Sequence, residues 1–394
     1  MSLIARKNVK SPLAIIAILV VIAAGIWIVF RALAAPVGVG IEPERATISN
    51  PATVASDFSA SSGQAVAFRA STPTPIPTPT PSGTQHVLTI NGPAFYLDGT
   101  RMQLWGARTA SATKDDAQAN HLIAQLDDYK SHGVNSVTVF YQGCRGAKYD
   151  PFSSDGRTIN AGHEARMEKI IKAANDRGMV VIVGLYYFAA PLNAKDGAAV
   201  RTTVKTVARA LKPYRNIIIN IANEQNSTEY RDTNRKFNFN DPKRIIELAG
   251  IIKTEDPSRL VGGGGFSEAS NKVIGKAATI DALLYDAAGN GVLPAAGPLY
   301  DKYIAAGITK PIVNVELLGG WTKQFPRGIF GASIQSKYKS EVDAGISRPN
   351  LGIFFHNNPW MQDIPMRYDL AGIGTSASPG IRWYFDYVKL KRGL

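Results

Sequence analysis

The chain has 394 residues, enough for one large domain with attached segments. Its 45% hydrophobic and 19% charged residues are typical of a folded protein with a substantial core. The formal net charge of +13 is spread along the chain, with no basic helix, zinc knuckle or RNP-like aromatic strand, so we do not predict nucleic-acid binding. The single cysteine, Cys144, excludes an intrachain disulfide, and the five histidines show no metal-ligand spacing. We therefore expect neither a metal nor a cofactor.

The N-terminal segment has the pattern of a membrane anchor. Three basic residues within residues 1–11 precede Leu13–Phe30, which carries no charge over 18 residues. This length is close to the roughly 20 residues that cross a bilayer, and it exceeds the apolar region of a usual signal peptide. Positive charge on the N-terminal side favours an N-terminus inside the cell. The sequence thus predicts a cytoplasmic segment over residues 1–11 and a single-pass anchor over residues 12–34.

A cleaved signal is the alternative interpretation of the same segment. The Ala32-Leu33-Ala34 sequence has the small-residue pattern of a signal-peptidase site. Cleavage would make the protein secreted instead of anchored in the cell membrane. Under both interpretations the rest of the chain is extracellular.

Residues 35–85 have the composition of a spacer. They are small and polar with weak patterning, and they include Ser71–Ser82, with the sequence STPTPIPTPTPS. Alternating proline favours an extended, semi-rigid polyproline II conformation, which would hold the next domain away from the membrane. We therefore place the start of the main domain at His86.

From His86 to Leu394 a hairpin signal at Asn91-Gly92 and Asp98-Gly99 is followed by alternating strand and helix patterns. The expected strands are Met102–Trp105, Val134–Val139, Met179–Leu185, Asn216–Ala222, Arg259–Gly263, Ile280–Tyr285, Pro311–Glu316 and Leu351–Phe355. The expected helices are Lys114–His132, Glu164–Arg177, Ala198–Leu211, Pro242–Thr254, Glu268–Lys276, Ala295–Ala306, Ala332–Ala344 and Ile381–Lys391. This order predicts a (β/α)8 TIM barrel over residues 86–394. An open doubly wound sheet is disfavoured because no G-x-G-x-x-G motif opens a helix.

Two of the expected strands end in a glutamate. Asn216–Ala222 is dense in β-branched residues, as in a strand buried on both faces, and is followed by Asn223 and Glu224. Pro311–Glu316 has the same design. Since barrel enzymes keep their chemistry at the C-terminal ends of the strands, the two glutamates predict a paired-carboxylate hydrolase.

These motifs resemble clan A of the glycoside hydrolases, and most closely the cellulase family, glycoside hydrolase family 5. The resemblance runs from about His86 to the C-terminus. It rests on the motifs YLDG…LWGA in the first hairpin, SHGVNSVTV at strand two, NIIINIANEQN at strand four and PIVNVELLGG at strand seven. It implies a retaining glycosidase of cellulase or mannanase type, which cleaves β-glycosidic bonds of an extracellular glycan by a two-glutamate double displacement.

The resemblance also implies roles for single residues. Glu224 would be the general acid/base and Glu316 the nucleophile, with pKa values pushed apart by their environments. Retention requires their carboxyl groups to lie about 5–5.5 Å apart, which the ends of strands four and seven allow. Asn223 would bind the 2-hydroxyl of the sugar, and Tyr285 would hydrogen-bond the nucleophile. Asp286, which follows it, is a further candidate for the barrel mouth.

The remaining substrate-binding candidates lie near other strand ends, where aromatic rings can stack on sugars. We assign Tyr187, Trp321, His356 and Trp360 to substrate binding, and we expect Trp105 to be buried. Clan members often carry an arginine in strand two that supports the nucleophile, and here Thr138 takes that position. Such departures indicate an altered substrate.

The prediction as a whole is a monomeric extracellular hydrolase that acts on a β-linked glycan and is held at the membrane by its N-terminal helix. A non-catalytic glycan-binding barrel is the alternative. Loss of Glu224 or Glu316 would mark that alternative, and both are present. A surface adhesion protein would instead show a large exposed apolar patch.

Overall fold

The computed structural model describes residues 52–56, 64–68, 85–144, 147–188, 190–286, 295–319 and 327–394. The chain divides into two units at Pro77 and Thr78, slightly before the predicted boundary at residue 86. In the first unit, β1 (Ala52–Ser56) pairs with β2 (Gln64–Phe68) in an antiparallel hairpin. The predicted anchor over residues 12–34 lies outside the described residues. Among the helices within the described ranges, none has the length and apolar character needed to cross a membrane.

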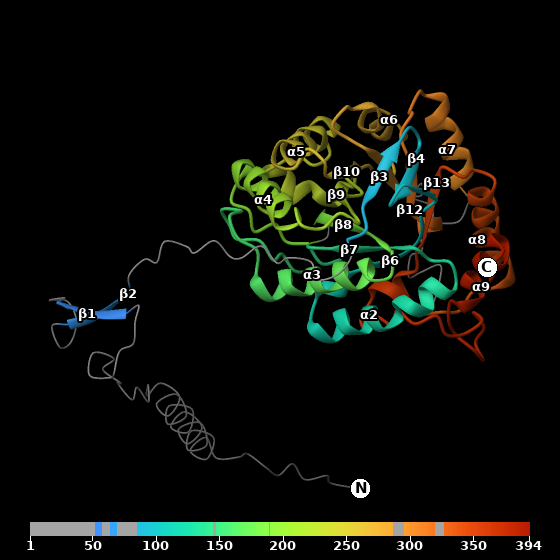
Figure 1. Ribbon diagram of the computed structural model, residues 1–394, viewed down its shortest axis with the longest axis horizontal. Coiled ribbons are helices and arrows are strands. Elements are labelled where there is room, and N and C mark those ends of the chain that lie inside the picture. The colour runs from blue at the N-terminus through green and yellow to red at the C-terminus, as the bar shows by residue number, and fades with distance from the viewer. Residues whose placement is uncertain are drawn as a thin grey trace, which may run out of the picture. The chain divides into compact units, whose positions relative to one another are not determined.

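The second unit is built around a closed barrel of eight parallel strands with helices around it (Figure 1). The strands are β6 (Trp105–Ala110), β7 (Ser136–Phe140), β8 (Val180–Tyr187), β9 (Ile217–Asn223), β10 (Leu260–Gly263), β11 (Ala282–Asp286), β12 (Ile312–Glu316) and β13 (Leu351–Phe355). They follow one another around the barrel in chain order, and β13 closes on β6. The predicted TIM barrel is confirmed.

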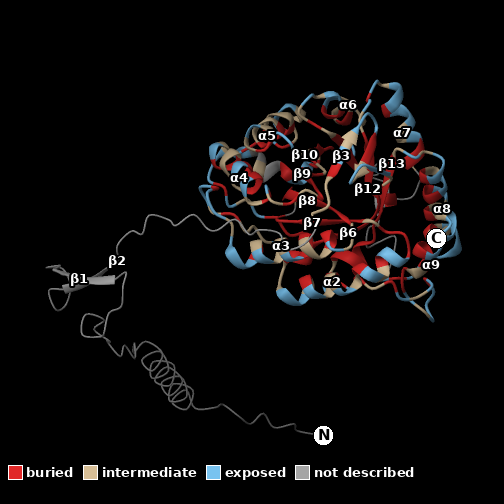
Figure 2. Ribbon diagram, in the orientation of Figure 1, coloured by how far each residue is buried: buried red, intermediate tan, exposed pale blue. Residues whose placement is uncertain are grey.

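Helices alternate with these strands and turn exposed faces outward, while the strands are buried (Figure 2). The helices are α2 (Asp116–Ser131), α3 (Ala161–Asn175), α4 (Gly197–Ala210), α5 (Pro242–Glu255), α6 (Glu268–Lys276), α7 (Ala296–Ala305), α8 (Ala332–Ile346) and α9 (Arg382–Arg392). Side chains that accept from the first-turn N–H groups start five of them: Asp115, Asn160, Asp196, Asp241 and Ser267. These caps explain why the helix starts were predictable to within a few residues.

A small antiparallel sheet covers the N-terminal end of the barrel. It consists of β3 (Leu88–Asn91), β4 (Ala94–Leu97) and β5 (Thr100–Met102). Its Leu88 and Phe95 pack in one cluster with residues at the starts of barrel strands, including Val180 and Ile218. This sheet therefore leaves uncovered the opposite end of the barrel, where the strands finish.

The first barrel strand differs from the prediction of Met102–Trp105. Met102 ends β5, whereas the barrel strand begins at Trp105 and continues to Ala110. The sequence of this strand, WGARTA, lacks the large β-branched residues that signal a buried strand. Small residues suit it because Phe354 of β13 fills the interior beside it: a Cβ atom on Gly106 would lie 2.2 Å from the Phe354 ring.

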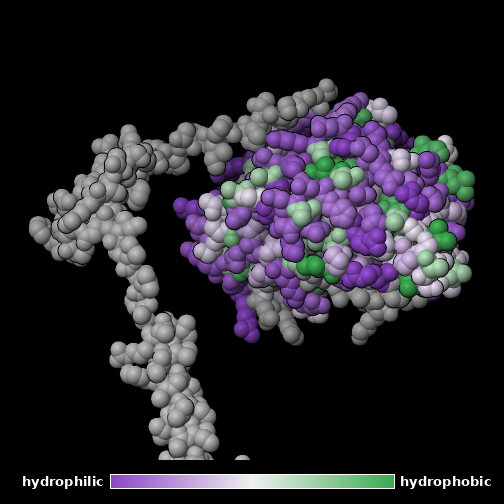
Figure 3. Space-filling model, turned by 90° about the horizontal axis from the view of Figure 1, so that it is seen from below, coloured by the Kyte–Doolittle hydropathy of each residue, from purple (hydrophilic) through white to green (hydrophobic). Residues whose placement is uncertain are grey.

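The outer surface tests the alternative of a surface adhesion protein, which would show a large exposed apolar patch. Figure 3 shows a face of the barrel unit that is mostly hydrophilic, with hydrophobic residues scattered in small groups. Scattered exposed apolar residues are usual for a soluble domain. The face shown in Figure 3 therefore does not favour a large apolar interaction surface.

The contact between Gly106 and Phe354 gives a test of the barrel interior. We expect Gly106→Ala to lower the free energy of unfolding by about 1–3 kcal/mol or more, because the added methyl overlaps the Phe354 ring. The matched control is Gly250→Ala within α5, where the nearest neighbour of a new Cβ lies 3.8 Å away. The control should be neutral or stabilising by up to about 1 kcal/mol. Urea unfolding of both variants measures the difference, and equal stability would contradict this packing.

Candidate active site

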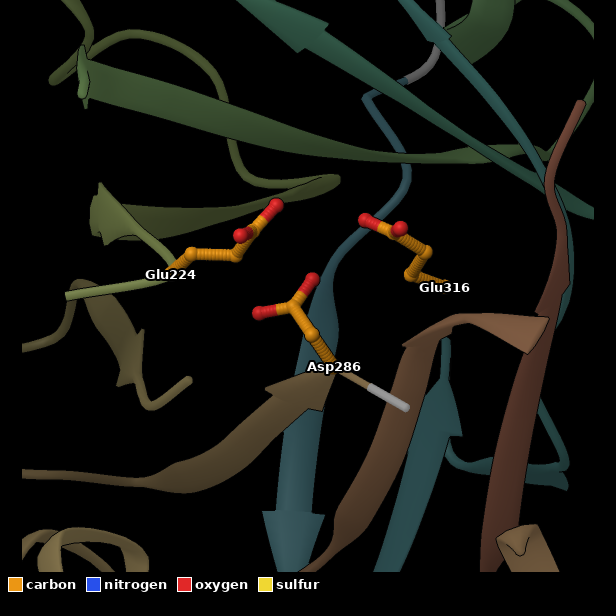
Figure 4. Close-up of side chains that lie close together, drawn as sticks. All are labelled: Glu224, Asp286 and Glu316. Carbon is orange, nitrogen blue, oxygen red and sulfur yellow. The ribbon is translucent and has the colours of Figure 1, made fainter. Parts of the chain in front are cut away.

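Three carboxylates converge at the C-terminal end of the barrel. Glu224 directly follows β9, Asp286 ends β11 and Glu316 ends β12. Their side chains point toward one another (Figure 4), and one oxygen of each lies within 4.8 Å of the others. Asp286 and Glu316 are each only 4% exposed, and Glu224 is half-buried. The two predicted glutamates therefore lie close together, and Asp286 lies beside them.

Glu224 occupies a turn that leaves the end of β9. Its φ of +44° is unusual for a residue other than glycine. The turn is held by hydrogen bonds from the Ser227 N–H to the Glu224 carbonyl (2.7 Å) and from the Gln225 N–H to the Gly264 carbonyl (3.3 Å). Strained backbone of this kind is concentrated at functional sites, where surrounding contacts hold it in place.

Arg108 of β6 is the cation of the site and is almost completely buried. Its Nη2 donates to Oδ1 of Asn223 (2.6 Å) and lies 3.4 Å from Oε2 of Glu316. Its Nη1 lies 3.4 Å from Oδ1 of Asp286. Burial lowers the pKa of the guanidinium, whereas the negative charges of Glu316 and Asp286 raise it by more than burial lowers it. The net shift of the pKa is upward, so Arg108 stays charged.

Sequence reasoning missed Arg108 because the first strand was predicted to end at Trp105. The pairing of neighbouring barrel strands shows how the arginine could have been found. Arg108 pairs directly with Thr138 of β7, the position at which the family resemblance placed the supporting arginine. The arginine therefore comes from the neighbouring strand at the same level of the barrel.

His356 contacts Glu316 from the side of β13. Its Nε2 lies 3.3 Å from Oε1 of Glu316, and the residue is 2% exposed. The side-chain amide of Gln362 donates to Nδ1 of His356 (2.8 Å), which leaves Nε2 to carry the proton that faces Glu316. The structure thus places His356, predicted as a substrate ligand, against the predicted nucleophile.

Asn223 links the arginine to Glu224. Its Oδ1 accepts from Arg108, and its Nδ2 donates to Oε1 of Glu224 (3.2 Å). Its carbonyl accepts from the hydroxyl of Tyr230 (2.9 Å), which fixes the end of β9. These bonds orient the Asn223 side chain and hold it beside Glu224.

The electrostatics of the site favour protons on two of the three carboxyls. Loss of solvent and the nearby Glu316 and Asp286 raise the pKa of Glu224 well above its ordinary value, although Arg108 and Asn223 oppose the rise. Burial raises the pKa of Asp286 to about 7, with Glu316 adding to the rise and Arg108 opposing it. The surroundings therefore favour the protonated forms of both Glu224 and Asp286.

Tyr187 lies close to the carboxylates. It is 4% exposed at the end of β8, with its ring stacked on Phe188 (centroids 4.6 Å apart) and edge-on to Phe140 (5.9 Å). Burial raises the pKa of its hydroxyl well above the ordinary value, with nearby Cys144 and Glu224 adding to the rise. Trp321, the other aromatic candidate of this kind, lies outside the described residues.

Two predicted ligands lie elsewhere. The structure corrects the place expected for Tyr285, whose hydroxyl donates to the carbonyl of Ala296 (3.0 Å) on the helix side of β11. A register shift between Tyr285 and Asp286 turns the latter toward Glu316. Trp360 is 1% exposed, and its indole N–H donates to the Asp369 carbonyl (2.7 Å), so no ring face is open to a sugar.

Replacement of Arg108 tests how far the cluster depends on its cation. We expect Arg108→Met to lower the free energy of unfolding by about 3–5 kcal/mol, because buried carboxylates lose their counter-charge. The loss should be larger at pH 8 than at pH 5, where the raised pKa values of Glu224 and Asp286 keep both carboxyls protonated. Arg348→Met is the control, since its pair with Asp301 is partly exposed and should contribute about 0.2–1 kcal/mol. Equal losses in the two variants, measured by thermal unfolding, would contradict the buried-cation role.

Known proteins place this geometry in context. Residues 90–274 match the family model described as Cellulase (glycosyl hydrolase family 5). The matched range contains Arg108, Asn223 and Glu224, whereas Asp286 and Glu316 lie beyond it and are assigned by geometry. A search of curated proteins gives no match.

Solved structures of similar fold include three polysaccharide hydrolases. The endo-1,4-beta-mannanase from Rhizomucor miehei is 15% identical with a TM-score of 0.51, covering 69% of this chain and 90% of that one. A beta-glucanase from Saccharophagus degradans, in complex with cellotetraose, is 14% identical with a TM-score of 0.53, covering 80% of this chain and 98% of that one. The beta-1,4-D-mannanase from Cryptopygus antarcticus is 15% identical with a TM-score of 0.51, covering 78% and 95%. At these identities the likeness shows the fold; the family match, joined to the carboxylates at the barrel mouth, identifies the chain as a cellulase-like glycosidase that resembles glycosyl hydrolase family 5.

Proposed function

We propose that this protein is a retaining glycoside hydrolase that cleaves β-glycosidic bonds of an extracellular polysaccharide or oligosaccharide. The observation that carries the proposal is the approach of Glu224 and Glu316, with carboxylate oxygens within 4.8 Å. Retaining enzymes hold the two carboxyls about 5–5.5 Å apart, whereas inverting enzymes need about 6.5–9.5 Å to admit a water between carboxylate and sugar. The short separation supports a covalent double displacement.

In the first step, a carboxylate oxygen of Glu316 attacks the anomeric carbon while Glu224 gives its proton to the departing glycosidic oxygen. The bond to the leaving group breaks, and a glycosyl ester forms on Glu316. In the second step, the Glu224 carboxylate takes a proton from water, and the resulting hydroxide displaces Glu316 from the sugar. Two inversions at the anomeric carbon give net retention.

The surroundings of the two glutamates support this assignment of roles. The raised pKa of Glu224 favours a proton on the group that must act first as an acid. Arg108 and the Nε2 of His356 both contact Glu316 and favour its ionised form. Asn223, held between Arg108 and Glu224, is in place to bind the sugar hydroxyl next to the anomeric carbon.

We further propose a β-1,4-glucan or a β-mannan as the substrate class. The similar structures are named as a beta-glucanase and as mannanases, and the partly exposed ring of Phe188, which follows β8, suits the apolar face of a β-linked sugar. The uncharged segment behind basic residues at the N-terminus supports an extracellular protein anchored by residues 12–34, or a secreted one if the segment is cleaved.

Substitution of the nucleophile gives the primary test. The wild-type protein should release reducing sugar from β-glucan or β-mannan, and Glu316→Gln should lower this rate by at least about 10³-fold, because no covalent intermediate can form. Glu229→Gln, an exposed residue in the segment after Glu224, is the matched control and should keep the wild-type rate. Undiminished release by Glu316→Gln would rule out the nucleophile role. No release by the wild type from any β-linked glycan would count against the proposed function.

Azide rescue separates the roles of the two glutamates. On an aryl glycoside with a good leaving group, Glu224→Ala in azide should give a β-glycosyl azide, because azide attacks the intermediate that no longer has its base. Glu316→Ala should instead give the α-glycosyl azide, because azide replaces the missing nucleophile directly. NMR of the product distinguishes the anomers. The same anomer from both variants would contradict the assignment.

A further inference from the structure

Asp286 is a buried carboxyl that the two-glutamate mechanism does not use. Its backbone N–H donates to the Gly265 carbonyl (3.1 Å), and its position in the β11 register is opposite Glu316 of β12. The register shift just before it is an irregularity of the kind that re-aims a side chain next to an active site. As a result Asp286 points into the space shared with Glu316 and Glu224 (Figure 4).

The carboxyls of Asp286 and Glu316 lie close together, with one oxygen of each within 4.8 Å, and Glu316 raises the pKa of Asp286. Two ionised carboxylates can only accept hydrogen bonds, and at this distance in a buried site they repel each other, so the pair favours one proton between them. The charge balance within the described part of the chain agrees, because there one guanidinium, that of Arg108, lies 3.4 Å from both groups. With one shared proton the three groups are neutral together, whereas with none they would leave an extra negative charge in a buried site.

We propose that Asp286 is the positioning residue of the nucleophile: it keeps the shared proton and donates it in a hydrogen bond to the ionised carboxylate of Glu316. The inference rests on the proposed role of Glu316. In the family pattern a tyrosine at the end of this strand binds the nucleophile, and in this chain the hydroxyl of that tyrosine, Tyr285, is bonded to Ala296 instead. Asp286, the next residue in the chain, acts as the donor to Glu316 instead, and its pKa of about 7 agrees with a proton held up to neutral pH.

The donor is lost when Asp286 ionises, and Glu316 then faces a second negative charge. The charged and titratable groups around Asp286 are Arg108 of β6, Glu224 after β9, Glu316 of β12, Tyr230 of the segment Thr228–Arg235 and Tyr303 of α7. Glu224 must also keep its proton to act as the acid. The fall of activity at alkaline pH should therefore involve two protons, one from each group.

Two substitutions of Asp286, by asparagine and by alanine, distinguish the effect of its donated hydrogen bond from the effect of its ionisation. In the wild type, log(kcat/KM) should fall above the optimum with a slope of about −2. Asp286→Asn keeps a donor that cannot ionise, so it should retain activity within about tenfold at the optimum and show a slope of about −1. Asp286→Ala removes the donor and should lower kcat by about 10²-fold. Asp281→Asn, at the residue just before β11 begins, is the control and should keep the slope of about −2.

Thermal unfolding of the full-length protein tests the shared proton without any substrate. The folded-state pKa of about 7 lies above the ordinary value of 3.8, so the stability contributed by protonated Asp286 is complete below about pH 4 and is lost as the pH rises to about 7. Asp286→Asn cannot titrate. The Tm of this variant minus that of the wild type should therefore increase from about pH 4 to about pH 7 and level off above.

The pH profiles and the Tm differences together distinguish failure of the Asp286 role from failure of the proposed function. If the wild type cleaves a glycan but Asp286→Asn changes neither the slope nor the pH dependence of the Tm difference, the role of Asp286 is overturned and the proposed function stands. Equal loss of activity in the asparagine and alanine variants also overturns the donor role. If no glycan is cleaved, the proposed function fails, and the Tm difference alone decides whether the Asp286–Glu316 pair holds a proton.

Discussion

The buried charge of Arg108 is the interaction that allows the carboxylates to lie so close together. Two unit charges 4 Å apart interact with about 4 kcal/mol at an effective dielectric constant of 20, so neighbouring ionised carboxyls would repel strongly. Arg108 contacts Asp286 and Glu316 at 3.4 Å each and also binds Asn223. Its planar fork holds donors toward several acceptors in one fixed geometry, whereas a lysine would present a compact point charge on a flexible stem. The remainder of the site is arranged around this one guanidinium.

Environment, more than residue type, separates the roles of the two glutamates. Both lie at strand ends, but Glu224 lies on a strained turn and its carboxylate accepts a hydrogen bond from the neutral amide of Asn223. Glu316 is fixed between a guanidinium and an imidazole, each a donor that favours a carboxylate. The same chemical group can therefore hold a proton at one position and act as an anion at the other, as acid/base pairs in enzymes require.

The fold was largely predictable because strong periodic patterns carry it. Leu351–Phe355 and Glu268–Lys276 were predicted to the residue, since dense apolar strands and capped helices leave clear boundaries. Glu224 and Glu316 followed from the rule that barrel chemistry lies at strand ends. Trp360 could not be recognised as buried, because its contacts come from the chain around Asp369, which has no periodic signal. The phase of β11 was also hidden, since the shift before Asp286 depends on pairing with β12.

Arg108 shows why the supporting residues were harder to find than the carboxylates. A motif comparison matches residues strand by strand. Because strand two carries Thr138 where the family has an arginine, such a comparison predicts that this chain lacks the supporting arginine. In a closed barrel, however, residues in register on neighbouring strands deliver their side chains to the same level of the interior. Arg108 and Thr138 are such a pair. A guanidinium can therefore come from either strand and reach the same carboxylates.

The strand that supplies it must have small side chains at its other inward positions. The strand β6 meets this condition, because Gly106 leaves room for the Phe354 ring below the arginine. The level of the barrel is thus a better guide than the strand number to which residues can serve the site.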